Sequence, residues 1–476
     1  MAMVFRILGG LVVLGLIVGC ASRPINQPIE SVDPETGYRP AVMLPKRSGN
    51  DPSTLFILSF SGGGTRAAAL SYGVLEELNE TSYVHENGEK RRLIDEVDVI
   101  TGVSGGSFTA LSFALYGDRL FDEYEQRFLK RNVQGALARR AFLNPANWFR
   151  MMSGNYGRSE VAAEYYDEIL FEGATFDDLM EKDTPVAIAS GTDITSGSRF
   201  AFYQDDFDLL CSDLGAVRLS RAAATSSAVP MALSPVTLNN YGGSCNYQYP
   251  AWVSDALQLE AEQLPPGREL ERYKEMAAFR DSKNRPYIHL VDGGVSDNIG
   301  VRGVLIALEG FFFSKEFSEA QGFGGIKRII LIIVNARSAH DRDWQQKESP
   351  PGSFKQLAQS TGVPIERYSF ESIELMKDQV EAAGLHRKLR VAEAINAGAS
   401  REEAEARFPK TVFHVMDVSF DDIRDSKERD YFMDLPTSFV LEDEEVDRLR
   451  GVAGDLMRQT RAYQEFLQSI GAQSPE

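Results

Sequence analysis

The sequence is poor in cysteine, histidine and positive charge. Its 476 residues include three cysteines and five histidines, and these are not spaced as metal ligands are. The net charge of −19 disfavours nucleic acid as a partner, because nucleic acid is also an anion. With 43% hydrophobic residues, the chain can still fill a substantial core. We therefore predict a sizeable folded protein that uses no metal or other cofactor and binds no nucleic acid.

Long apolar runs are also missing, except at the amino terminus. No segment after residue 20 predicts a transmembrane helix. An apolar run over 7–19 follows Arg6 and ends at Cys20. This run is too short to cross a bilayer comfortably, and it fits the hydrophobic part of a signal peptide.

The segment Ile17–Ser22 resembles the lipobox of bacterial lipoproteins, in which the cysteine is lipidated and becomes the first mature residue. Ala21 after the cysteine resembles lipoproteins sorted to the outer membrane. We predict a signal peptide over 1–19 and a lipidated Cys20 that starts a flexible tether over 20–51. The expected location is the bacterial cell envelope, on the outer membrane, facing the periplasm or the cell surface. An ordinary signal peptide or anchor helix with an incidental cysteine is the alternative.

A serine on a glycine-rich turn is the strongest chemical signal in the chain. The turn Gly102–Gly106 follows an apolar run over 97–101, which predicts a strand, and precedes a predicted helix over 107–115. A G-x-S-x-G serine between strand and helix is typical of the nucleophile of serine acyl hydrolases. We therefore predict Ser104 as a nucleophile. A plain connecting turn would show the same local pattern.

The base that should accompany this serine is not an obvious histidine, because none of the five sits in a turn after a late strand. Asp292 does occupy such a place, since it ends an apolar run over 287–291 and is followed by Gly293 and Gly294. An aspartate there points into the crevice at the carboxyl ends of the strands of an open α/β sheet. His289 lies three residues earlier and faces the other side of the strand. The prediction is a Ser104–Asp292 dyad.

A glycine-rich loop upstream offers backbone N–H groups. It joins an apolar predicted strand over 55–60 to a predicted helix over 67–78. Its amides suit a developing oxyanion, and we predict as donors Gly62, Gly63 and Gly64, together with Gly105. A phosphate would fit the same loop. The nucleotide alternative is weak, because no Lys-Ser or Lys-Thr closes the loop and Ala67 replaces the last glycine of the dinucleotide fingerprint.

Together these motifs resemble those of the patatin-like phospholipases. The matching segments are, in order, Gly62–Arg66, Gly102–Gly106, Thr225–Pro230 and Asp292–Gly294. Thr225 and Ala67 depart from the residues that the family more often has, but neither departure removes a catalytic atom. The resemblance covers about residues 52–306, and four motifs in register are specific where one is not.

The resemblance implies a three-layer α/β/α sandwich with a mostly parallel central sheet, related to the α/β hydrolases. It implies hydrolysis of acyl esters in phospholipids or other lipids, without calcium. We expect a catalytic core over 52–310 with a helical insertion near 121–180, and strands and helices over 311–476 that complete or extend this core. The insertion would shape an acyl-chain pocket as a cap, or simply pack as an outer layer.

The remaining predictions concern supporting residues. We expect Gly102, Gly293 and Gly294 to allow the two tight turns. Arg66 would neutralise charge or bind a substrate phosphate near the loop, or else form a structural salt bridge. Cys211 and Cys245 would form a disulfide in an oxidising compartment, with two free buried thiols as the alternative.

Further elements follow from apolar periodicity. We predict strands over 185–190 and 198–203, a central strand over 328–334 and an edge strand over 411–418. Predicted helices cover 300–312, 354–383 with a break at Pro364, 387–397, 400–407 and 442–468.

The sequence therefore predicts a membrane-anchored serine acyl hydrolase that acts on lipid esters. Two alternatives remain, a different acyl hydrolase such as a thioesterase or protease, and a catalytically idle scaffold tethered to the membrane.

Overall fold

The structure is a computed structural model that describes residues 22–85, 88–250, 267–313, 325–338 and 348–472. Its main sheet has the strand order β10-β9-β1-β4-β5-β8-β7, with β6 paired to β5. The strands are β1 (Thr54–Phe60), β4 (Val99–Gly102), β5 (Val186–Asp193), β6 (Arg199–Ala201), β7 (Val236–Asn239), β8 (Tyr287–Asp292), β9 (Arg328–Asn335) and β10 (Val412–Ser419). From β10 to β5 every pairing is parallel, whereas β8 and β6 pair antiparallel with β5, and β7 antiparallel with β8. The predicted α/β class with a mostly parallel sheet is confirmed.

The described α-helices surround this sheet. They are α2 (Pro40–Met43), α3 (Gly64–Glu80), α4 (Gly105–Tyr116), α5 (Leu120–Tyr124), α6 (Val133–Phe142), α7 (Pro145–Met151), α8 (Arg158–Tyr166), α9 (Phe176–Met180), α10 (Gln204–Leu209), α11 (Leu219–Ser226), α13 (Gly267–Arg280), α14 (Gly294–Asp297), α15 (Arg302–Phe313), α17 (Ser353–Asn396), α18 (Arg401–Arg407), α19 (Ser426–Asp434), α20 (Asp443–Gln459) and α21 (Arg461–Ile470). A separate small hairpin pairs β2 (Ser82–Val84) with β3 (Lys90–Arg92).

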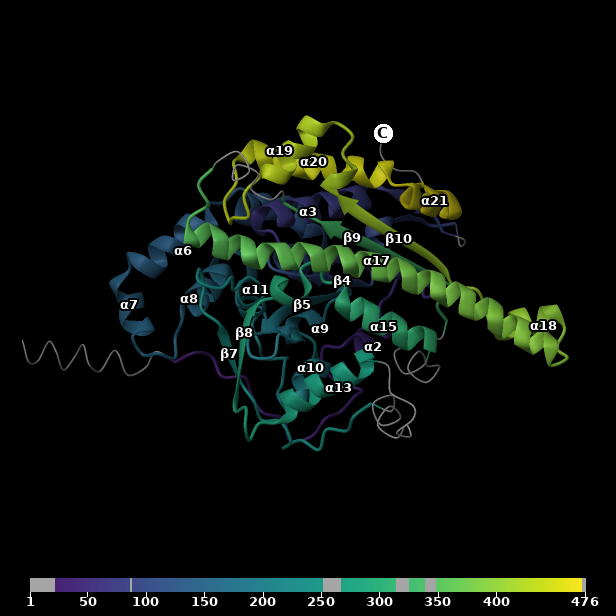
Figure 1. Ribbon diagram of the computed structural model, residues 1–476, viewed down its shortest axis with the longest axis horizontal. Coiled ribbons are helices and arrows are strands. Elements are labelled where there is room, and N and C mark those ends of the chain that lie inside the picture. The colour runs from purple at the N-terminus through teal and green to yellow at the C-terminus, as the bar shows by residue number, and fades with distance from the viewer. Residues whose placement is uncertain (1–21, 86–87, 251–266, 314–324, 339–347, 473–476) are drawn as a thin grey trace, which may run out of the picture.

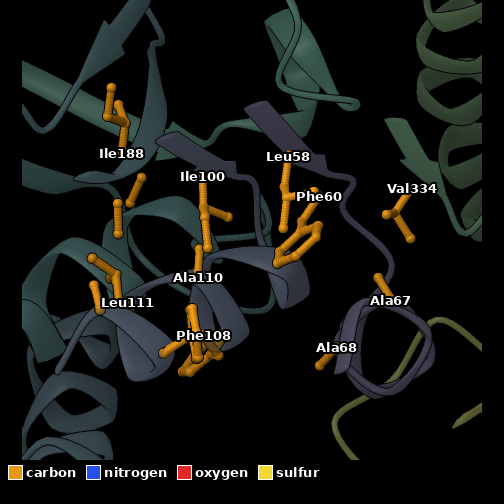
Figure 2. Packing of buried hydrophobic residues seen from close by; sticks show 14 of the residues in the cluster. Leu58, Phe60, Ala67, Ala68, Ile100, Phe108, Ala110, Leu111, Ile188 and Val334 are labelled. Carbon is orange, nitrogen blue, oxygen red and sulfur yellow. The ribbon is translucent and has the colours of Figure 1, made fainter. Parts of the chain in front are cut away.

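The central strands β1 and β4 are buried along their whole length and mostly apolar, because helices cover both of their faces. Toward α3 and α4, alternate strand residues such as Leu58, Phe60 and Ile100 pack on Phe108 and neighbouring small side chains (Figure 2). On the opposite face, the hydroxyl of Ser59 donates to the carbonyl oxygen of Ile299, just after α14. Helix α17 crosses in front of the strands on this second side (Figure 1). Strand β10 lies at the edge of the sheet, as predicted, whereas β9, which was predicted to be central, lies next to it, second from the edge.

The flexible tether expected over 20–51 is wrong for the residues that the structure describes, which begin at Ser22. The ring of Tyr38 is fully buried, and the buried Arg39 forms ion pairs with Asp205 and with the buried Asp208. Asn26 donates to the hydroxyl of Ser212. Prolines and polar residues dominate this segment, yet a few specific contacts are enough to fix it on the body.

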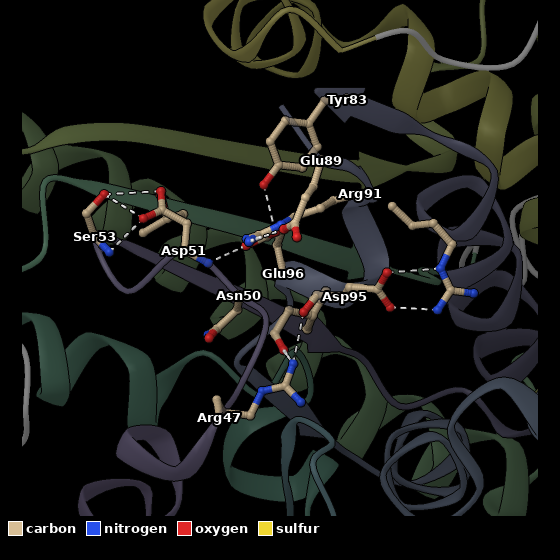
Figure 3. A network of polar contacts seen from close by, with 12 residues as sticks. Arg47, Asn50, Asp51, Ser53, Tyr83, Glu89, Arg91, Asp95 and Glu96 are labelled. Carbon is tan, nitrogen blue, oxygen red and sulfur yellow. Dashed lines mark hydrogen bonds and ion pairs between the residues drawn. The ribbon is translucent and has the colours of Figure 1, made fainter. Parts of the chain in front are cut away.

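The end of this segment belongs to a polar network at the amino-terminal edge of the sheet (Figure 3). Arg47 donates to the carbonyl oxygens of Asp95 and Val97, at 3.0 and 3.1 Å. The amide of Asp51 donates to Glu96 at 2.6 Å, and the hydroxyl of Tyr83 donates to the same carboxylate. The network ties the chain before β1 to the turn before β4, at the edge away from the serine.

The part of the chain after Gly310 contributes β9 and β10 to the same sheet. The predicted break at Pro364 is wrong, because α17 continues through this proline from Ser353 to Asn396. Proline removes one helical hydrogen bond without ending this helix, and Ile373 and Met376 further along it are buried. The helix predicted over 442–468 is two helices that meet at Thr460, whose backbone is extended.

Candidate active site

Ser104 occupies the turn between β4 and α4. Its backbone lies at φ 48° and ψ −120°, a region that residues other than glycine rarely adopt. The turn is tight enough that a β-carbon at Gly102 would lie 2.7 Å from the Cα of Ser107. Such a strained turn raises the serine hydroxyl above the carboxyl end of the sheet, as in a nucleophile elbow.

Asp292 reaches Ser104 from a strand that runs against its neighbours. β5 continues beyond the end of β4, where Gly102 pairs with Ala189, and β8 pairs antiparallel with that extension. Asp292 therefore pairs with Gly191, close to the level at which β4 ends. The parallel pairing of the strands from β10 to β5 thus ends at β8, yet the antiparallel register delivers the carboxylate to the same edge. The hydroxyl of Ser104 donates to Oδ2 of Asp292 at 2.9 Å.

The environment of Asp292 raises the pKa of its carboxyl group. The residue is 7% exposed, and burial raises its pKa to about 6. Two hydrogen bonds act in the opposite direction, one from Ser104 and one from the amide of Gly294, which lies 2.7 Å from Oδ1. An aspartate with a pKa near 6 is a much better proton acceptor at neutral pH than an exposed one.

His289 faces the other side of the strand from Asp292, as predicted. Its side chain is exposed, and ring atom Nδ1 lies 3.0 Å from the hydroxyl of Thr237 on the neighbouring strand. The only hydrogen bond that the structure gives to the Ser104 hydroxyl within the described residues is the one with Asp292.

The glycine-rich loop lies beside the serine, but its amides are not equivalent. Gly62 donates to the carbonyl oxygen of Asn298 at 2.8 Å, so its predicted place among the oxyanion donors is wrong. Within the described part of the chain, the amides of Gly63, Gly64 and Gly105 have no hydrogen-bond acceptor. A β-carbon at Gly105 would lie 2.0 Å from the carbonyl oxygen of Gly64, so these two backbones touch. Three unpaired amides next to a serine hydroxyl are suited to stabilising an oxyanion.

Arg66 lies inside the protein and makes neither of the contacts expected of it. Its guanidinium donates to the carbonyl oxygens of Ala336 and Leu435 and to the hydroxyl of Thr437. The side chain is 2% exposed, and burial lowers its pKa to about 10. With every nitrogen turned to the protein, Arg66 holds the segment before α20 against the glycine loop and is closed to a substrate phosphate.

Two residues that the sequence reasoning did not assign complete the frame of the site. Ser226, at the end of α11, accepts the amide of Ser104 with its hydroxyl at 2.9 Å, and its carbonyl oxygen accepts the amide of Gly293 at 3.1 Å. The side-chain oxygen of Asn298 fills the space that β-carbons at Gly62 and Gly294 would need. The match at Thr225–Pro230 is the one sequence signal that pointed to Ser226.

Cys211 and Cys245 form a disulfide. The backbone of the amino-terminal segment bonds to both, since Ile29 donates to the carbonyl oxygen of Cys211 and Val32 to that of Cys245. Cys20 lies outside the described residues. Within the described ranges, no three histidine, cysteine or acidic side chains form a metal-binding group, and no helix combines the length and the apolar character needed to cross a membrane.

Comparison with known proteins places the site in a family. The family model described as patatin-like phospholipase matches residues 58–305, just over half of the chain, and this range includes Ser104 and Asp292. No curated protein sequence matches the chain.

Among solved structures, human GIVD cytosolic phospholipase A2 is similar over 92% of this chain, with 12% identity and a TM-score of 0.42. The chain spans 65% of the length of that structure. VipD from Legionella pneumophila is similar over 95% of this chain and 72% of its own length, with 10% identity and a TM-score of 0.31. On the strength of the family model, the chain belongs to the patatin-like phospholipases, a family of lipid acyl hydrolases.

Proposed function

We propose that this protein hydrolyses acyl esters of lipids through a Ser104–Asp292 dyad. The observation that carries the proposal is the 2.9 Å hydrogen bond from the Ser104 hydroxyl to a buried carboxylate, beside three unpaired amides. A nucleophile, its base and an oxyanion site are the parts that acyl transfer requires. Family membership supports a lipid ester as the substrate.

The reaction follows from these positions. Asp292 takes the proton of Ser104 as the serine oxygen attacks the acyl carbonyl carbon. The amides of Gly63, Gly64 and Gly105 donate to the resulting oxyanion. When the carbonyl reforms, the bond to the alcohol breaks, and Asp292 returns the proton to the leaving oxygen. Water then attacks the acyl-serine with Asp292 again as base, which releases the fatty acid and restores the serine.

A panel of substrates tests the proposal against its alternatives. The full chain is reacted with a fluorophosphonate probe and then assayed on phospholipid, acyl thioester and peptide substrates. Labelling at Ser104 together with fatty-acid release from phospholipid is the expected result. Labelling with hydrolysis of only thioester or peptide would indicate a different acyl hydrolase, and neither labelling nor hydrolysis would indicate an idle scaffold.

We also propose that the chain is held at a bacterial membrane through a lipid on Cys20, as an outer-membrane lipoprotein of the cell envelope. The apolar run over 7–19 ending at this cysteine supports lipidation. The Cys211–Cys245 disulfide supports an oxidising compartment, since cytosolic thiols are kept reduced. In cells fed radioactive palmitate, label should appear in the wild-type chain and be lost in Cys20→Ser. Label retained by Cys20→Ser would contradict lipidation at this residue.

A further inference from the structure

The helical insertion after α4 divides into a buried and an exposed part. Tyr124, Phe128 and Leu129 are buried in the core, so this part of the insertion packs against the body as a layer. The hairpin formed by α6 and α7 instead exposes large apolar side chains, which we name the tip patch: Phe142, Leu143, Trp148, Phe149 and Met152. Leu143 and Met152 are 74% and 77% exposed, and Trp148 is 48% exposed. An apolar group of this size on an exposed hairpin is typical of an interaction site.

The hairpin and the residues that flank it are also basic, although the protein as a whole is acidic. Residues 126–159 contain no aspartate or glutamate, whereas they contain Arg127, Lys130, Arg131, Arg139, Arg140, Arg150 and Arg158. Arg131 and Arg139 are exposed and make no ion pair with any carboxylate among the described residues. Arg127, Lys130, Arg140 and Arg150 each pair with a carboxylate outside this stretch, so Arg131 and Arg139 are the exposed cations that an anionic partner would meet.

The hairpin is held in a defined shape. Asn132 caps α6 and Asn144 caps α7 through their side-chain oxygens. The side-chain amide of Asn147 donates to the carbonyl oxygen of Arg140 at 3.0 Å, and this arginine pairs with Glu168 at 2.7 Å. Arg150 stacks on the ring of Tyr156 at 3.9 Å. Exposure of the tip patch is therefore a property of the folded hairpin and does not come from fraying.

The hairpin that carries the tip patch lies on the side of the molecule where the parallel strands have their carboxyl ends. Strands β9 and β10 point toward the end of the molecule that carries α6 and α7 (Figure 1). The chain just after α7 also meets the frame of the active site. Arg158 donates to the carbonyl oxygen of Met231, which is 59% exposed. Three residues before Met231, the carbonyl oxygen of Ala228 accepts the amide of Asp292.

We propose that the α6–α7 hairpin docks on an anionic lipid surface. The apolar side chains of the tip patch would enter the acyl-chain boundary, while Arg131 and Arg139 would bind lipid phosphates. This inference rests on the proposed lipid hydrolysis, because docking there brings the neighbouring active site to its substrate. The charge of the hairpin fits an anionic bilayer, although the protein as a whole is acidic.

The sole tryptophan of the hairpin allows a direct test. In full-length chains carrying Trp252→Phe, Trp344→Phe and Ser104→Ala, Trp148 is the only indole and the vesicles stay intact. Its fluorescence is measured on vesicles with brominated acyl chains, made of phosphatidylglycerol and phosphatidylcholine or of phosphatidylcholine alone. We expect a blue shift and quenching on the anionic vesicles. Arg131→Gln should lower the ratio of inserted to free protein about fivefold, and so should Arg139→Gln.

A matched control comes from another exposed apolar pair, Leu385 and Leu389 on α17, which are 57% and 56% exposed. Leu385→Ser with Leu389→Ser should leave quenching of Trp148 unchanged, whereas Leu143→Ser with Met152→Ser should abolish it. Absence of quenching on vesicles that nevertheless bind the chain would overturn the proposal. The proposal would also be overturned if analytical ultracentrifugation showed a dimer of the wild-type chain that dissociates in the Leu143→Ser, Met152→Ser variant.

Activity separates this inference from the proposed function. With Ser104 intact, Leu143→Ser with Met152→Ser should cleave a dissolved short-chain ester at the wild-type rate and anionic vesicles at least tenfold more slowly. Equal rates on vesicles would overturn hairpin docking alone. A chain with Trp252→Phe and Trp344→Phe and an intact Ser104 that inserts Trp148 but cleaves neither substrate would contradict the proposed hydrolysis alone.

Discussion

The hydroxyl of Ser226 accepts the backbone amide of Ser104 at 2.9 Å, and the carbonyl oxygen of the same Ser226 accepts the amide of Gly293 at 3.1 Å. One residue at the end of α11 thus fixes both the strained serine turn and the turn that follows Asp292. The relative position of the two groups depends on this link because they come from strands that run in opposite directions.

Ser226→Ala should lower the rate constant of fatty-acid release about tenfold to a hundredfold with little change in KM, because it leaves the Ser104 amide unpaired and loosens the dyad. Rates on a dissolved ester measure the effect. Ser227→Ala is the matched control, since Ser227 is equally buried but its hydroxyl donates to the carbonyl oxygen of Ala223, on the helix that ends just before it. Equal rates for the two variants would show that the link has no role in positioning.

Gly105→Ala should reduce hydrolysis by about a thousandfold, because its β-carbon would push away the carbonyl of Gly64 and separate the two amides. The comparison is Gly451→Ala on α20, where no atom lies within 4 Å of the added carbon, and this variant should keep full activity. Full activity in Gly105→Ala would exclude the Gly64–Gly105 pair as the oxyanion site.

The raised pKa of Asp292 predicts the pH dependence of the reaction. The base must be ionised, so kcat/KM should fall tenfold per pH unit below an inflection near 6. An inflection near 4 would mean that burial does not act on this carboxyl group in the way described.

The same pKa has a consequence for stability. Between about pH 4 and 6 the folded chain binds a proton at Asp292 that the unfolded chain has lost, so this residue costs stability as the pH rises through that window. Asp292→Asn should therefore be more stable than wild type at pH 8, by no more than about 3 kcal/mol, and the difference should shrink toward pH 4. Urea unfolding at the two pH values measures this, and a variant less stable than wild type at pH 8 would contradict it.

Arg66→Met should destabilise the protein by about 3 kcal/mol, because it leaves the buried carbonyls of Ala336 and Leu435 without a donor. Arg461→Met, on an exposed side chain at the surface, should shift the urea midpoint little. A normal midpoint for Arg66→Met combined with a higher KM for phospholipid would instead indicate substrate binding by Arg66.

The sequence predicted the elements around the site well because each has a strong local signal. Apolar runs marked β1, β4 and β9, and the glycines marked the turns that hold Ser104 and Asp292. Direction and pairing are not local properties, however. The antiparallel course of β8 depends on β5 extending past β4, and no pattern within 287–292 encodes it.

The wrong predictions for Gly62 and for the segment over 22–51 have the same origin, since both depend on contacts between distant parts of the sequence. Gly62 donates to Asn298, more than 200 residues away in sequence, so a glycine-rich pattern alone overstated the number of unpaired amides. The segment over 22–51 is polar and rich in turns. Tyr38 and Arg39 fix it through partners far away in the sequence, which are Ala187, Asp205 and Asp208. Such contacts become visible only once the chain is folded.

The most direct test of the proposed dyad is fatty-acid release by Ser104→Ala and Asp292→Asn at pH 8, beside the wild-type chain. We expect each variant to lose at least about a thousandfold in rate while its circular dichroism spectrum stays native, and only the wild type to form an acyl-enzyme. A wild-type rate in Asp292→Asn would contradict the proposed dyad, because it would mean that another group takes the proton of Ser104.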